Sequence, residues 1–210
     1  MANTNTPFGL ASVRAQDGNN TGVLKHYYVA ATNATDLYIG DPVVKTGSAN
    51  ATEILGHAAG SLASVGKAAA TGAITGVMVG ILPNGESYLN GKLPAGQEAV
   101  ILVDDDLTKK FNIQANGTVT AAMIGQNANI AVTGTGNSYS GLSGVALDVA
   151  TVGTEAAKQL KIIGVADYIT NEFGNYSIVE VLINNDTEAH NTAGIAAAAA
   201  ESNTESNGQS

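Results

Sequence analysis

The stretch that decides the predicted fold is Phe111-Asn112-Ile113-Gln114-Ala115-Asn116-Gly117-Thr118-Val119-Thr120. Apolar and polar residues alternate on both sides of Asn116-Gly117. Such alternation is typical of strands with one buried face and one solvated face. The Asn-Gly pair tolerates the positive φ that a tight turn demands. We therefore predict a β-hairpin that turns at Asn116-Gly117.

The same strand pattern recurs through most of the chain. Short β-branched or aromatic runs are separated by Gly, Asn and Pro, and no amphipathic helical pattern lies between them. Strands at this spacing favour a barrel or a sandwich over βαβ units. We therefore expect an all-β fold, a single compact β-barrel/sandwich domain. The expected strands are Leu24 to Ala30, Leu37 to Val44, Ile74 to Leu82, Ala99 to Val103, Phe111 to Gln114, Thr118 to Ile124, Asn129 to Thr133, Gln159 to Ala166 and Tyr176 to Ile183.

The two ends of the chain differ in composition from the middle. Residues 1–20 carry Pro7-Phe8-Gly9-Leu10 among small polar residues, which predicts an extended N-terminal arm. Residues 185–210 combine an alanine block with a polar end, which predicts a C-terminal tail. We expect the compact domain to span residues 21–184.

Composition excludes several classes of protein. The chain has no cysteine, which rules out disulfide frameworks, thiolate zinc sites and cysteine nucleophiles. Its net charge of −9, with only nine Lys and Arg residues, argues against nucleic-acid binding. The longest weakly polar run, Ala68 to Leu82, is too short to span a bilayer, and Met1 to Thr6 lacks the features of a signal peptide. The low charged fraction of 13% predicts a surface of small and polar side chains suited to protein contacts.

No catalytic or cofactor-binding motif is recognisable in the sequence. The three histidines, His26, His57 and His190, are too widely separated to form an H-x-x-x-H ligand pair. Clustered carboxylates such as Asp104-Asp105-Asp106 can hold Ca²⁺, but the spaced D-x-D-x-D-G loop is absent, which favours a solvated turn or an acidic contact. We therefore predict no enzyme activity, no cofactor and no metal site.

Several segments carry a resemblance through their order along the chain. They are Ala2 to Leu10, Leu37 to Val44, Ile74 to Gly80, Val103 to Asp106, Gln159 to Ile163, Asn171 to Gly174 and Val181 to Asn184. In this order the chain resembles the head decoration (cement) proteins of tailed bacteriophages over most of residues 1–184. The resemblance implies a compact β domain on the outer face of the virion capsid, made in the host cytoplasm. It also implies that the domain bridges subunits of the major capsid protein as a homo-oligomer, with a trimer favoured over a dimer, and contacts neither nucleic acid nor membrane.

Two groups of residues are the predicted protein contacts. Phe8 and Leu10 are chosen because an apolar pair in a polar arm needs a pocket. Asp104, Asp105 and Asp106 are chosen as an acidic docking edge. The alternative function is another virion structural component, a tail tube, fibre or spike that binds a host surface, although the absence of a fixed repeat favours a compact domain. A third alternative is a virion-borne glycosidase or peptidase, for which the sequence reveals no acid/base pair.

Overall fold

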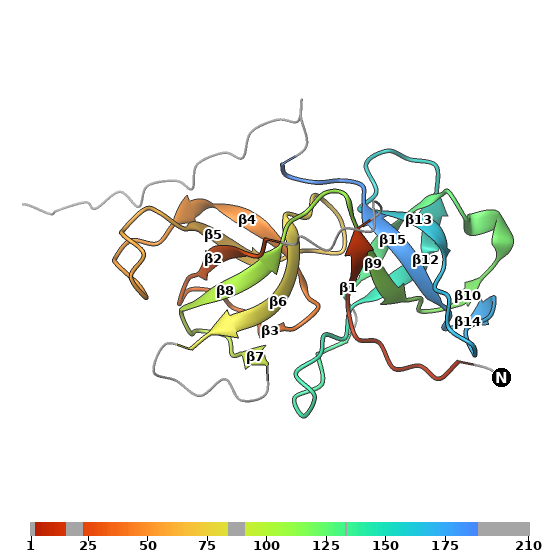
Figure 1. The fold of residues 1–210 in the computed structure, drawn as a ribbon, viewed down its shortest axis with the longest axis horizontal. Helices are drawn as coiled ribbons and strands as arrows, with labels where there is room; N and C mark the ends of the chain where they lie inside the picture. Colours follow the sequence, from red (N-terminus) through yellow and green to blue (C-terminus); the bar gives the residue numbers. More distant parts are fainter. Residues whose placement is uncertain (1–2, 16–22, 84–90, 133, 189–210) are drawn as a thin grey trace, which may run out of the picture.

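The computed structural model describes residues 3–15, 23–83, 91–132 and 134–188, and there the chain is almost entirely β-structure (Figure 1). The strands are β1 (Ala11–Ala15), β2 (Lys25–Val29), β3 (Leu37–Tyr38), β4 (Pro42–Ala49), β5 (Ala63–Lys67), β6 (Gly76–Leu82), β7 (Lys92–Leu93), β8 (Ala99–Asp104), β9 (Lys109–Gln114), β10 (Thr118–Val119), β11 (Asn127–Ala131), β12 (Ala146–Gly153), β13 (Leu160–Val165), β14 (Gly174–Asn175) and β15 (Ile178–Ile183). A 3₁₀ turn, η1 (Ala121–Met123), is the only helix in these ranges. No described segment is a helix long and apolar enough to cross a membrane. The predicted all-β fold is confirmed.

Five strands close into a barrel in the order β2-β5-β4-β6-β8. Neighbouring strands are antiparallel except for β2 and β5, which run parallel. Successive side chains of a strand point to opposite faces, so Tyr27 and Val29 of β2 both point into the barrel. They pack there with Val43, Met78 and Ile101. The barrel is therefore filled by side chains.

Six strands form an open sheet in the order β1-β9-β15-β13-β11-β12, and every pair in it is antiparallel. Strand β15 shows how the sequence directs the sheet's packing. Val179, Val181 and Ile183 are buried, while the residues between them are partly exposed. Strands β1 and β12 are the two edges of this sheet.

The barrel and the sheet lie side by side and share one apolar core (Figure 1). Ile74, two residues before β6, and Val77 of β6 pack in the same cluster as Phe111 and Val181 of the sheet. The chain passes from barrel to sheet through the short turn between β8 and β9. This turn contains two of the three predicted acidic contact residues, Asp105 and Asp106.

The predicted hairpin at Asn116-Gly117 is wrong. Strand β9 pairs on one side with β1 and on the other with β15, so neither of its edges is free for β10, which pairs with β14 instead. The chain turns away from β15 at Asn116, whose backbone N–H donates to the carbonyl of Leu147 in β12 at 2.9 Å. Neither Asn116 nor Gly117 has the positive φ that a two-residue hairpin turn requires.

Other strand predictions were partly right. The expected strand Thr118 to Ile124 ends after Val119, where the chain enters η1. The expected strand Leu37 to Val44 is broken between β3 and β4, because the turn at Gly40 makes room for the N-terminal segment. A Cβ added at Gly40 would lie 2.6 Å from the Phe8 carbonyl oxygen. Strands β1, β5 and β12 were not predicted. Small residues give β1 and β5 a weak strand pattern, whereas β12 has an alternating pattern at Leu147, Val149 and Thr151 that was not recognised.

The predicted N-terminal arm needs correction over its second half. Residues 11–15 form β1, an edge strand of the sheet, and the Leu10 side chain is only 2% exposed within the shared core. The residues before it also lie along the sheet, where the Thr6 N–H donates to Gln114 Oε1 at 2.8 Å. Of the predicted tail, residues 185–188 contact the barrel, and residues 189–210 are outside the described part of the chain.

Candidate functional site

The three consecutive aspartates do not form one acidic surface. Asp104 ends β8 with its side chain 2% exposed, and its Oδ2 lies 2.6 Å from Lys109 Nζ and accepts a hydrogen bond from Ser12 Oγ at 2.5 Å. The pair joins β8 of the barrel to β9 and β1 of the sheet. The other carboxylate oxygen of Asp104, Oδ1, has no hydrogen-bond partner among the described residues. Asp104 therefore connects the two halves of the molecule and is not available as a docking residue.

Asp105 and Asp106 also have partners within the chain. Asp105, 5% exposed at its side chain, accepts a hydrogen bond from Tyr27 Oη at 2.9 Å and pairs with Lys25 Nζ at 2.7 Å. Burial raises the pKa of Tyr27, and the hydrogen bond to Asp105 raises the pKa of Lys25. Asp106 accepts from the backbone and the hydroxyl of Thr108, which lowers its pKa. Of the predicted acidic docking edge, Asp104 and Asp105 therefore have carboxylates that are 2% and 5% exposed and paired within their own chain.

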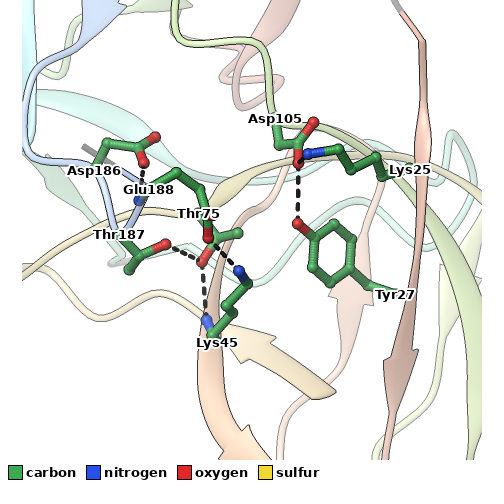
Figure 2. A network of polar contacts seen from close by, with 8 residues as sticks. All are labelled: Lys25, Tyr27, Lys45, Thr75, Asp105, Asp186, Thr187 and Glu188. Carbon is green, nitrogen blue, oxygen red and sulfur yellow. Dashed lines mark hydrogen bonds and ion pairs between the residues drawn. The ribbon is translucent and has the colours of Figure 1, made fainter. Parts of the chain in front are cut away.

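A carboxylate-rich seam, defined here as Asp105, Asp186 and Glu188 with Lys45, joins the end of the described chain to the barrel. Figure 2 shows these side chains with Lys25, Tyr27, Thr75 and Thr187. The Thr187 N–H donates to the Ile74 carbonyl at 3.2 Å, and the Thr187 and Thr75 hydroxyls are 2.8 Å apart. Lys45 forms an ion pair with Glu188. The seam holds residues 186–188 against the start of β6 and the middle of β4.

Asp186 is the unusual group of the seam. It is 4% exposed, and its Oδ2 has no partner among the described residues, while Oδ1 accepts the Glu188 N–H. Burial, with a smaller contribution from the nearby charges of Glu188 and Asp105, raises its pKa from 3.8 to about 6. Its folded-state pKa is above its unfolded value, so the folded state binds more protons between these two values and loses stability as the pH rises through them.

We expect Asp186→Asn to flatten this pH dependence. Asparagine keeps the oxygen that accepts the Glu188 N–H and removes the buried negative charge. The difference in unfolding free energy between variant and wild type should grow in favour of the variant from pH 4 to pH 6 and then level off. Urea unfolding of both proteins at half-unit pH steps measures it. A constant difference across this range would contradict the raised pKa.

An exposed apolar loop lies between β13 and β15. Its tip carries Tyr168, Ile169 and Phe173, which are 51%, 104% and 52% exposed. Asn171 holds the loop in place: its amide donates to the Ala166 and Ile178 carbonyls, both at 2.8 Å, and its oxygen accepts the Ile178 N–H at 2.9 Å. The sequence did not predict this loop as a contact, because the alternating patterns of β13 and β15 end on either side of it.

Of the predicted apolar contacts, Phe8 is partly buried, and Leu10 belongs to the core.

A second group that the sequence did not predict is a pair of histidines. His26 Nδ1 and His57 Nε2 are 3.0 Å apart on the barrel surface, with their rings at 87°. They are 31 residues apart in the chain, so they match no closely spaced ligand motif and the sequence does not reveal the pair. No third His, Asp or Glu joins them, and no group of three such residues is placed to hold a metal ion anywhere in the described ranges.

A hollow lies beside Tyr38 of β3 and Lys67 of β5. It has a volume of about 300 Å³ and is lined by residues that include Asp36, Tyr38 and Lys67. Its lysine pairs with Asp41 at 3.0 Å, and Asp36 pairs with Lys92 at 2.6 Å. Its charged groups are thus neutralised by neighbours within the chain.

Comparison of the chain with protein-family models, with curated proteins and with solved structures gives no match.

Proposed function

We propose that the chain is a structural protein of a bacteriophage head, a decoration (cement) protein that binds the outer surface of the capsid and bridges major capsid subunits. The observation that carries the proposal is the apolar loop with Tyr168, Ile169 and Phe173. Three large apolar side chains are exposed within six residues of this one loop, and an exposed apolar patch marks a protein-interaction site. The order of sequence segments that resembles head decoration proteins supports the same function.

The loop is suited to binding because its backbone is already ordered. Asn171 makes three hydrogen bonds that fix the loop on β15 and on the end of β13. The Ser177 hydroxyl adds a further hydrogen bond, because its Oγ lies 2.6 Å from the Glu172 carbonyl oxygen and 3.0 Å from that of Gly174. Binding through a pre-organised loop loses little conformational entropy, so its apolar contacts contribute more fully to affinity.

The sheet edges offer a second means of attachment. Strand β1 pairs only with β9 among the strands described, whereas the outer edge of β12 is partly occupied, because Leu147 forms an isolated bridge with Ala115 and accepts the Asn116 N–H. Unpaired edges can accept a strand from a neighbouring subunit. Several modest contacts made together by one chain, or by a homo-oligomer, combine into firm attachment.

A trimer is our preferred assembly, and light scattering on the purified protein tests it.

The proposal predicts that replacing both Ile169 and Phe173 with serine weakens binding at least about tenfold, because apolar contacts at the centre of an interface cost more than about 1 kcal/mol each when truncated. The measurement is co-sedimentation with undecorated shells of the phage that encodes the chain. Fold is checked by circular dichroism. The matched control replaces Leu107 and Ile124, 39% and 36% exposed on other loops, with serine and should bind as wild type does.

Two outcomes would count against the proposal in different ways. A wild-type chain that does not sediment with the shells overturns the decoration function, and attachment to host cells would instead support the fibre or spike alternative. Full binding by the Ile169→Ser, Phe173→Ser variant leaves the function standing but shows that this loop is not the contact.

A further inference from the structure

We propose that His26 and His57 form a surface binding site for a late first-row transition-metal ion such as Zn²⁺ or Ni²⁺. The inference is independent of the proposed function. It rests on the separation of the two ring nitrogens and on the structure that holds each ring.

The nitrogen separation fits two ligands of one ion. Zn–N bonds are about 2.0–2.1 Å long, so two cis imidazole nitrogens on one ion lie roughly 2.9–3.4 Å apart. His26 Nδ1 and His57 Nε2 are 3.0 Å apart. In the structure the two nitrogens form a hydrogen bond with each other, and an ion would replace that bond once both rings have turned their lone pairs toward it. Imidazole nitrogen suits Zn²⁺, Ni²⁺ and Cu²⁺, whereas Mg²⁺ and Ca²⁺ prefer oxygen.

His26 is held by the barrel. It lies in β2, where it pairs with Leu102 of the neighbouring antiparallel strand β8. The residues on either side of it are fixed as well, since Lys25 pairs with Asp105 and Tyr27 points into the barrel core. The histidine therefore has a defined backbone position, and its side chain is on the outer face.

His57 is held by a tight turn. Ile54 and His57 exchange two backbone hydrogen bonds, at 3.0 and 2.9 Å, around Leu55 and Gly56, whose φ values are 49° and 80°. Two positive φ values in a two-residue loop are the geometry of a type I′ turn. Leu55 is a bulky residue in a left-handed conformation that such residues rarely adopt. Backbone strain of this kind is often found at binding sites.

The segment that carries this turn is anchored to the barrel, so His57 cannot move far from His26. Buried Asn50 donates its amide to the Ala58 carbonyl at 2.8 Å, and its oxygen accepts the Leu62 N–H at 2.9 Å. Ile54 and Leu62 pack with Val100 of β8. Figure 1 shows this loop, between β4 and β5, at the end of the barrel away from the sheet.

The pair alone makes only an exposed hydrogen bond between two rings, which contributes little to stability. As ligands, the two rings would bind one ion, and water would fill its remaining coordination positions. The chain contains no cysteine and three histidines, so competing strong nitrogen or sulfur donors are few. Metal binding here would connect β2 to the 50–62 loop.

The test follows the three histidine ring signals of the full chain by NMR during titration with ZnCl₂. We expect the His26 and His57 signals to shift together, saturating at one ion per chain, while the His190 signal and a parallel MgCl₂ titration show no change. Isothermal calorimetry should show the Zn²⁺ binding heat lost in His26→Asn and in His57→Asn. The matched control, His190→Asn, should bind as wild type does.

Any of three results would overturn the site. These are no shift of the His26 and His57 signals at millimolar ZnCl₂, unchanged binding in either single variant, or saturation at one ion per two chains, which would indicate an ion held between copies. The wild-type titration decides the question even where a variant folds poorly.

Discussion

Replacing Asp104 with alanine is expected to lower the free energy of unfolding by about 3–5 kcal/mol, because it leaves a buried charge without its partner. The Lys109 side chain is 6% exposed and lies 2.6 Å from the Asp104 carboxylate. Ser12 of the edge strand β1 would lose its acceptor in the same change. The pair lies where barrel and sheet join, so urea unfolding, read by circular dichroism, should report the loss for the whole molecule.

Two further variants separate the charge from the packing. Asp104→Leu combined with Lys109→Met should recover most of the lost stability, since a buried ion pair replaced by apolar residues of similar volume is often neutral or better. Glu180→Gln breaks a partly exposed pair with Lys110, whose side chains are 26% and 23% exposed, and should cost only about 0–1 kcal/mol. If Asp104→Ala cost no more than Glu180→Gln, the buried pair would not stabilise the junction.

Leu10→Ala is expected to destabilise the protein by about 2–5 kcal/mol, the usual loss for a large apolar side chain removed from a core. Leu10 is 2% exposed and packs in the cluster that barrel and sheet share. Its backbone is held as well, because its N–H donates to the Gly40 carbonyl at 2.9 Å. Urea denaturation measures the loss.

The matched control for Leu10 is Phe8→Ala, two residues earlier. Phe8 is partly buried, so its truncation should cost clearly less than that of Leu10. If the two variants lost the same unfolding free energy, or if Leu10→Ala were as stable as the wild type, Leu10 would again be a candidate contact residue. Replacing both Phe8 and Leu10 would therefore be a poor test of capsid binding, because the lost stability could weaken attachment by itself.

The strands with clear alternation were predictable from sequence, and those without it were not. Val179, Val181 and Ile183 of β15 mark one buried face by their spacing alone. Strand β5 consists mostly of Ala, Ser and Gly, and its pairing partners stabilise it more than its own residues do. Strand β12 is an exception, because Leu147, Val149 and Thr151 alternate and the strand was still not predicted. The hairpin at Asn116-Gly117 failed for a related reason: a turn-forming pair of residues does not form a hairpin when the strand before it already has two neighbours.

The surroundings of the candidate contact residues also depended on residues far apart in sequence, which no local pattern shows. Asp104 to Asp106 are acidic and consecutive, which suggested one surface. Their ion-pair and hydrogen-bond partners, Lys109, Lys25 and Thr108, lie on separate elements or in the turn itself. The exposed loop with Ile169 and Phe173 has no motif, and only its exposure in the folded chain identifies it.

By itself, the amino-acid sequence determined that the protein is built of β-strands and that it lacks cysteine chemistry, because strand periodicity and composition are local properties of the chain. The tertiary structure alone decided that the strands divide between a barrel and a sheet, that Asp104 and Leu10 lie in their junction, and that His26 meets His57. Each of these contacts joins residues far apart in sequence. Their pairing depends on which strand edges and apolar faces remain free once the others have packed, and no local pattern records that.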